Sequence, residues 1–157
     1  MLTFCIGGLT SQELMAATTQ TSTAQKTTTA TAATSTAITP VKPLALVNNP
    51  NAYLNKKVKI TATFDKFSSL GLDYKPALRS SEKYITFLIR RDDAQNDIPL
   101  SELKNFMKRE MAEKFIDLET DDVIEYTGFV FSNALGDVWL DVESFKIVSS
   151  KSKQKTK

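Results

Sequence analysis

The sequence predicts a mainly β domain with one helix, and two kinds of periodicity carry that prediction. Residues 57–65 alternate apolar and polar side chains, which is the pattern of a half-buried strand. The same alternation recurs at residues 84–91, 123–133 and 138–148. Residues 101–115 instead space their apolar side chains as the buried face of a helix does. All of these elements fall within residues 44–148, a length that suits one compact domain.

The alternation also predicts which strand residues face the core. The side chains expected inside are Val58, Ile60, Ala62, Phe64, Ile85, Phe87, Ile89, Val138, Leu140 and Val142. On the last strand, Trp139 shares the outward parity of Asp141 and Glu143. The core therefore takes one face of each strand and leaves the other face to solvent.

A short third strand and a helix are expected between residues 98 and 117. Pro99 would confine the strand at residues 98–100 to an edge. Ser101 is the expected N-cap of a helix of about four turns, with Glu102 in the first turn, where the helix dipole favours a carboxylate. Its apolar face would comprise Leu103, Phe106, Met107, Met111 and Phe115. Residues 133–137 then make a hairpin loop in which Gly136 supplies backbone freedom.

The segments outside residues 44–148 have a different composition. Residues 1–17 hold an apolar run too short to span a bilayer, with the small residues of a signal or anchor remnant but no positive start. Residues 18–43 are rich in Thr and Ala, which predicts a disordered linker, and residues 149–157 predict a basic disordered tail. A genuine signal would place the protein in the periplasm or cell envelope. Without one the protein would be cytoplasmic, and the residues leave both open.

Charge is distributed unevenly along the chain. The chain has 20 basic and 18 acidic residues, whereas residues 44–148 have 14 basic and 17 acidic ones. The positive excess therefore lies on the ends, which argues against a partner bound mainly through its phosphates. The chain has no His and one Cys, so it lacks the commonest general base and the ligands of a structural zinc site. We expect no metal and no cofactor.

The order of elements and three runs of sequence resemble the OB-fold. The runs are NPNAYLNKKVKITATF, TDDVIEYTGFVF and LGDVWLDVESFKIV, and the resemblance covers roughly residues 46–148. They are similar to small bacterial single-domain OB modules of the tRNA-anticodon-binding-like type, although Asp121 and Asp122 lack the glycine that usually precedes such a strand. The resemblance implies a five-stranded, partly open barrel with a helix between strands 3 and 4. It also implies that one face and the adjoining loops bind oligonucleotides or oligosaccharides.

Aromatic side chains suggest where such a ligand would lie. Phe129 and Phe131 share the outward parity of Glu125 and Thr127 on the fourth strand, and Trp139 is outward on the fifth. Exposed rings of this kind stack on the bases of single-stranded nucleic acid. The alternative is that the helix or the loop at residues 68–83 covers these rings, in which case they belong to the packing.

Five cations suggest a phosphate-binding patch on adjoining strands: Lys56, Lys57, Lys59, Arg90 and Arg91. The alternative is a solvated edge carrying lysine, which discourages edge-to-edge aggregation. The neighbouring acids Asp65, Asp92 and Asp93 favour that alternative because they dilute the positive field.

No pattern of a catalytic site occurs. The carboxylate pairs at residues 92–93 and 121–122 fall in polar turns, and there is no P-loop, GxSxG motif or Cys–His pair. The sequence therefore predicts a non-enzymatic, monomeric OB-type binding module with no transmembrane span. Single-stranded nucleic acid is the first expected partner. The alternative is an exported, tethered module that binds another protein or the cell envelope.

Overall fold

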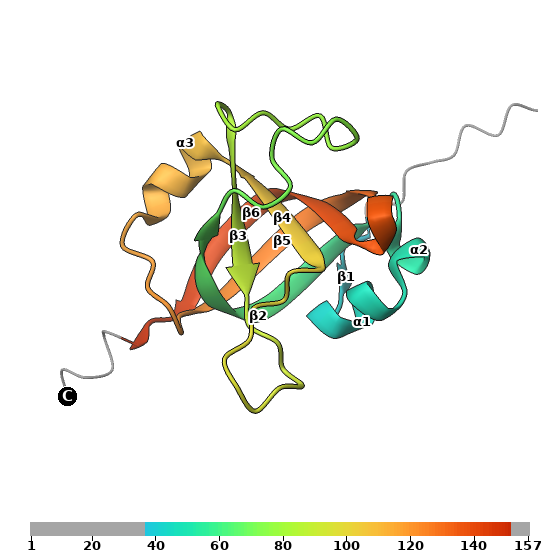
Figure 1. The fold of residues 1–157 in the computed structure, drawn as a ribbon. Helices are drawn as coiled ribbons and strands as arrows, with labels where there is room; N and C mark the ends of the chain where they lie inside the picture. Colours follow the sequence, from blue (N-terminus) through green and yellow to red (C-terminus); the bar gives the residue numbers. More distant parts are fainter. Residues whose placement is uncertain (1–36, 152–157) are drawn as a thin grey trace, which may run out of the picture. The chain divides into compact units, whose positions relative to one another are not determined.

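The computed structural model describes residues 37–151 (Figure 1). The signal or anchor remnant predicted at residues 1–17, most of the predicted linker, and the tail from residue 152 lie outside the described residues. Five long strands make up the body of the fold. They are β2 (Lys57–Ser68), β3 (Tyr84–Ile89), β4 (Leu103–Lys108), β5 (Val123–Ser132) and β6 (Val138–Ser149).

These strands form the predicted OB barrel. The order around the barrel is β2, β3, β4, β6, β5 and back to β2. Every pair is antiparallel except β4 and β6, which run parallel with Leu103 opposite Val138 and Phe106 opposite Asp141. We expected a partly open barrel, and this parallel pairing closes it. The helix lies between the third and fourth barrel strands, as the resemblance implied.

The third strand is the main correction to the sequence analysis. Residues 103–108, expected to be helical, form β4, while Pro99 makes only an isolated bridge to Arg90. The helix is confined to α3 (Arg109–Ala112) and the single turn η1 (Glu113–Phe115). Five consecutive residues from Leu103 are buried, because β3 and β6 flank the strand and side chains cover both of its faces. Such tertiary pairing outweighs local helix propensity.

Residues before the barrel also belong to the fold. β1 (Thr39–Pro40) runs parallel to β2, and α1 (Pro43–Asn48) and α2 (Pro50–Tyr53) follow it (Figure 1). Leu46 on α1 is fully buried against the barrel core. Residues 39–43, assigned above to the linker, therefore pair with or pack on the barrel.

The barrel core contains the side chains predicted from strand parity. Val58, Ile60 and Phe87 have no exposed surface, and neither has Leu140. Ile85 is only partly buried but packs against the same cluster. One polar pair lies among these residues: the hydroxyl of Tyr126 donates to Oδ1 of Asn105 over 3.1 Å. Asn105 in turn donates to the carbonyl of Phe87 over 3.3 Å, so the buried amide has partners.

Truncating the centre of this core gives the first prediction. Phe87→Ala should reduce the free energy of unfolding by about 3–5 kcal/mol, because it leaves a cavity among rings that cannot close in. Urea denaturation measures the change. Ile116→Ala is the control, since Ile116 is 80% exposed, and it should change stability by no more than about 0.5 kcal/mol. Equal effects of the two substitutions would contradict the core described here.

The buried hydroxyl gives a prediction about alkaline pH. Burial raises the pKa of Tyr126 above its usual range, and the hydrogen bond to Asn105 only partly opposes this. Above about pH 10 the unfolded tyrosine ionises while the folded one does not. The stability present below that pH should therefore be lost as pH rises, by about 1.4 kcal/mol per pH unit for this group. Urea midpoints should fall less steeply for Tyr126→Phe than for the wild type, and parallel curves would contradict the assignment.

Candidate functional site

A second apolar cluster lies on the outside of the barrel. Phe106 of β4 and Trp139 of β6 form its centre, and their rings stack with centroids 5.6 Å apart. Phe131 of β5 packs edge-on to Phe106 at 5.7 Å. Trp139 is only 1% exposed, although its outward parity was predicted correctly. The expectation of an exposed stacking face is therefore wrong for Trp139, and the packing alternative holds.

The loop between β2 and β3 covers this cluster. Tyr74 stacks on Trp139 with ring centroids 5.5 Å apart, and Ala77 is buried beside it. Gly71 lies against the cluster in the left-handed region at φ +84°, and a Cβ there would come within 3.2 Å of Phe106. We call residues 69–83 the covering loop, and the surface of Phe106, Phe131, Trp139 and Asp141 the covered face.

One arginine fastens the covering loop to the covered face. Nε of Arg79 donates to Oδ1 of Asp141 over 2.8 Å, and a terminal nitrogen of the same guanidinium pairs with Oδ2. The guanidinium lies 4.4 Å from the ring centroid of Phe131 and 5.5 Å from that of Tyr84. The hydrogen bond to Asp141 raises the pKa of Arg79, so the charge is fixed. A planar cation is thus held by one carboxylate and two aromatic rings.

The covering loop pairs with no strand of the covered face. Most backbone hydrogen bonds of the loop join loop residues, as from Asp73 to Arg79 and from Ala77 to Tyr74. Only at the end of the loop do backbone amides of the barrel and α3 donate to it, from Tyr84 to Ser80 and from Arg109 to Lys83. Side chains add further connections, including Nε of Arg109, which donates to the carbonyl of Ser81 over 2.7 Å. Figure 1 shows the loop beside α3, at one end of the barrel. The loop is a compact surface loop held by side chains.

Two exposed leucines flank the covered face in an unusual backbone conformation. Leu78 of the covering loop has φ 51° and is 81% exposed. Leu135, in the turn between β5 and β6, has φ 61° and is 75% exposed. Its neighbour Ala134 accepts a hydrogen bond from Nε1 of Trp139 over 2.9 Å, which ties this turn to the covered face. Large side chains at positive φ are uncommon and often lie at binding sites.

Four of the five predicted cations pair with an acid, whereas Lys56 forms no ion pair within residues 37–151. Lys57 pairs with Glu143 and Lys59 with Glu125, at 2.8 and 3.0 Å. Arg90 contacts the carboxylates of Asp65, Asp97 and Asp121, and Arg91 pairs with Asp93 and Glu102. The hydrogen bonds from Lys146 and Lys59 lower the pKa of Glu125, which therefore stays ionised and neutralises them. The structure does not bring the four cations together as a phosphate site.

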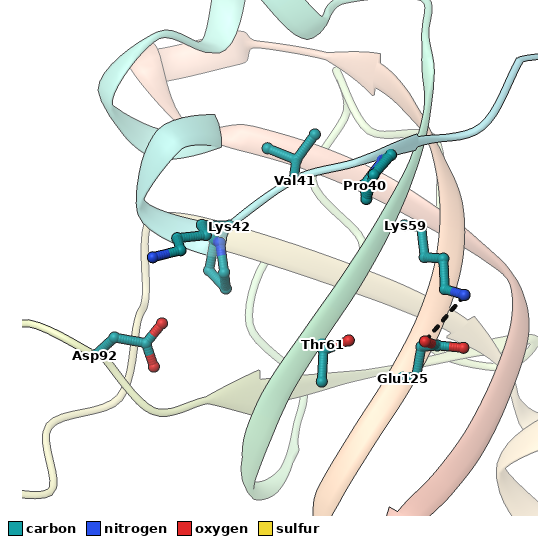
Figure 2. Close-up of a pocket in the computed structure, with 8 residues that line it drawn as sticks. Pro40, Val41, Lys42, Lys59, Thr61, Asp92 and Glu125 are labelled. Carbon is teal, nitrogen blue, oxygen red and sulfur yellow. Dashed lines mark ion pairs between the residues drawn. The ribbon is translucent and has the colours of Figure 1, made fainter.

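Lys59 instead lines a groove beside β2 (Figure 2). The groove has a volume of about 640 Å³ and is lined by Pro40, Val41, Lys42, Pro43, Lys59, Thr61, Asp92 and Glu125. Figure 2 shows the Lys59–Glu125 pair on one side and Asp92 on the other, with Thr61 between them. Two cations and two acids line the groove, so its charges balance. It offers no excess positive charge to a nucleic acid.

The sequence analysis missed two cations on the covered side. Lys83 and Lys108 lie on either side of Tyr84, which is paired with Lys108 across β3 and β4. They line a pocket of about 600 Å³ together with Arg109, Glu82, Glu110 and Glu113. Within residues 37–151 neither lysine forms an ion pair, but three acids share the pocket. The position of Lys108 on a strand could not be read from a segment with helical spacing.

Phe129, the last of the predicted site residues, and the acidic side chains complete the description of the site. Phe129 is half-buried on β5, opposite Asp141 of β6 and Lys57 of β2. In the described part of the chain, no group of three or more Cys, His, Asp or Glu side chains is placed to hold a metal ion. No helix among residues 37–151 is long and apolar enough to cross a membrane.

Comparison with known proteins finds similarity only in solved structures. No protein-family model matches the chain, and no curated protein matches it. Asparaginyl-tRNA synthetase from Pyrococcus horikoshii is 14% identical with a TM-score of 0.48, over 70% of this chain and 23% of that one. The S. pombe Stn1–Ten1 complex is 13% identical with a TM-score of 0.40, over 63% of this chain and 62% of that one.

A third similar structure is OBody AM1L10 bound to hen egg-white lysozyme. It is 12% identical with a TM-score of 0.42, over 63% of this chain and 85% of that one. The chain thus spans under a quarter of the synthetase and most of the OBody. The strand order and closure of the barrel define the OB fold of this chain.

The fit of the covering loop gives a prediction with a matched control. Gly71 and Gly136 both have positive φ, at +84° and +80°, but only a Cβ at Gly71 would meet the covered face. Gly71→Ala should therefore loosen the loop, whereas Gly136→Ala suffers the backbone strain alone. Trp139 is the only tryptophan, so its fluorescence should shift to longer wavelength in Gly71→Ala and remain buried-like in Gly136→Ala. An identical spectrum for both variants would show that the loop does not depend on this contact.

Proposed function

We propose that this chain is a non-enzymatic OB-type binding module that recognises a polypeptide on the covered face. The observation that carries the proposal is that this face already holds a polypeptide, the chain's own covering loop. It does so through the Arg79–Asp141 pair and the Tyr74–Trp139 stack rather than through strand pairing. Charge-assisted bidentate contacts and buried aromatic rings are the features that dominate protein–protein recognition.

The charges favour a protein over a nucleic acid. A single strand bound through phosphates needs cations without acidic partners, and four of the five predicted cations, Lys57, Lys59, Arg90 and Arg91, are in ion pairs. Stacking needs accessible rings, and Trp139 is buried. Beside the covered face the chain exposes Leu78 and Leu135, whose aliphatic side chains suit an apolar protein surface better than a sugar–phosphate chain.

A capture experiment with matched variants tests the protein-binding proposal. Full-length wild type, Leu135→Asp and Ile116→Asp are immobilised and exposed to an extract of the source organism. The side chains of Leu135 and Ile116 are 75% and 80% exposed, so neither substitution should unfold the domain. A partner should be retained by wild type and Ile116→Asp, lost from Leu135→Asp, and should bind the purified wild type directly. Equal retention by all three proteins would contradict binding at this face.

Single-stranded nucleic acid is the second candidate, favoured by the two lysines beside Tyr84. Lys83 and Lys108 flank a half-buried ring in a pocket, which is the combination that holds a phosphate next to a stacked base. The acids of the pocket weaken this candidate because they bring its net charge to zero.

Titration with a labelled oligothymidylate separates the two candidates. We expect no saturable binding at about 200 mM salt. Micromolar binding that falls steeply between about 50 and 200 mM salt, and that is lost in the double variant Lys83→Glu, Lys108→Glu, would instead establish the nucleic-acid site. The control is Lys57→Glu with Lys59→Glu, which carries the same charge change away from this pocket.

A further inference from the structure

The covering loop makes contacts that resemble those of a bound ligand. Arg79 places a guanidinium against a carboxylate of β6 and the rings of Phe131 and Tyr84, and the loop adds a stacked ring five residues earlier, at Tyr74. The receiving groups, by contrast, all belong to strands of the closed barrel. The site is therefore built into the rigid part of the fold, and its occupant belongs to a loop.

We infer that the covered face is a binding site for an arginine of a partner polypeptide, with an aromatic residue nearby, and that Arg79 and Tyr74 occupy it in cis. The inference rests on the proposed function and names the chemistry that the partner must carry. A partner arginine would replace Arg79 at Asp141 and over Phe131. A partner ring would replace Tyr74 on Trp139.

Three observations make the covering loop displaceable. Apart from the bonds of Ser80 and Lys83 at its end, its described backbone hydrogen bonds are internal, so residues 70–79 can leave without breaking a strand pair. Asp73 and Leu78 are non-glycine residues in the left-handed region, at φ 59° and 51°, which opposes the closed conformation. The Arg79 and Asp141 side chains are 21% and 27% exposed, so a competitor can approach the pair from solvent.

Planarity is what makes arginine the expected ligand group. A guanidinium can donate two parallel hydrogen bonds to one carboxylate while its face lies on an aromatic ring, whereas an ammonium cannot do both. The face should therefore discriminate arginine from lysine at equal charge. Within residues 37–151 no aromatic ring lies under the guanidinium of Arg91, which pairs with Asp93 and serves as the comparison for charge alone.

Chemical rescue tests the site without needing the partner. In full-length Arg79→Ala the guanidinium position is vacant, and N-acetyl-arginine amide is titrated against the protein by NMR. We expect saturable shifts of the Trp139 indole and the Asp141 amide, with at least about tenfold weaker binding of N-acetyl-lysine amide. Adding Asp141→Asn should abolish the shifts. Arg79→Gln, which keeps more of the side chain, repeats the measurement should the alanine variant fold poorly.

A peptide tests the loop as the bound element. A synthetic copy of residues 72–81 should bind Arg79→Ala more tightly than wild type, because in the wild type Arg79 competes for the site. The same peptide with lysine in place of its arginine should bind about tenfold more weakly or worse. The inference is overturned by the absence of saturable binding, by equal binding of the arginine and lysine probes, or by binding that survives Asp141→Asn. Such a failure leaves the capture result unaffected, so the two proposals can fail separately.

Discussion

The parallel pairing of β4 with β6 is the constraint on which the rest of this structure depends. It closes the barrel, and it forces residues 103–108 into a strand whose two faces are both covered. The same register sets Lys104 opposite Trp139 and Phe106 opposite Asp141, so rings and a carboxylate from two distant segments meet on the outer surface. The covered face is therefore a consequence of barrel closure rather than of any local motif.

Closure also explains which parts of the fold could be predicted from the sequence. β2, β5 and β6 each keep one buried and one partly solvated face, so the alternation along them could be recognised, and Ile60 of β2 and Leu140 of β6 were correctly placed inside. β4 has no such contrast, because Leu103 to Met107 are all buried. Leu103, Phe106 and Met107 also fall at the spacing of a helix face, so a strand buried on both sides was indistinguishable from an amphipathic helix.

The candidate site was harder to predict because it depends on pairings between segments far apart in the chain. The alternation along β6 correctly placed the side chain of Trp139 on the outer face of the barrel. It could not show that Tyr74, 65 residues earlier in the chain, stacks on that ring. The predicted phosphate-binding patch is not formed for a related reason, because Glu143 and Glu125 come close to Lys57 and Lys59 only when the barrel folds. The charge count of residues 44–148, with its excess of acids, had argued against a partner bound mainly through its phosphates. For this question the count over the domain was more informative than the local cluster of cations.

In the proposed site, the covering loop competes with any ligand for the covered face. A site that is open for only a fraction of the time binds with an apparent affinity reduced by that fraction, so a stronger Arg79–Asp141 pair means a weaker partner. The same competition increases specificity, because a ligand must replace both the guanidinium and the ring that it displaces. In the proposed site, a ligand offering only charge or only an apolar surface would not replace both the guanidinium of Arg79 and the ring of Tyr74.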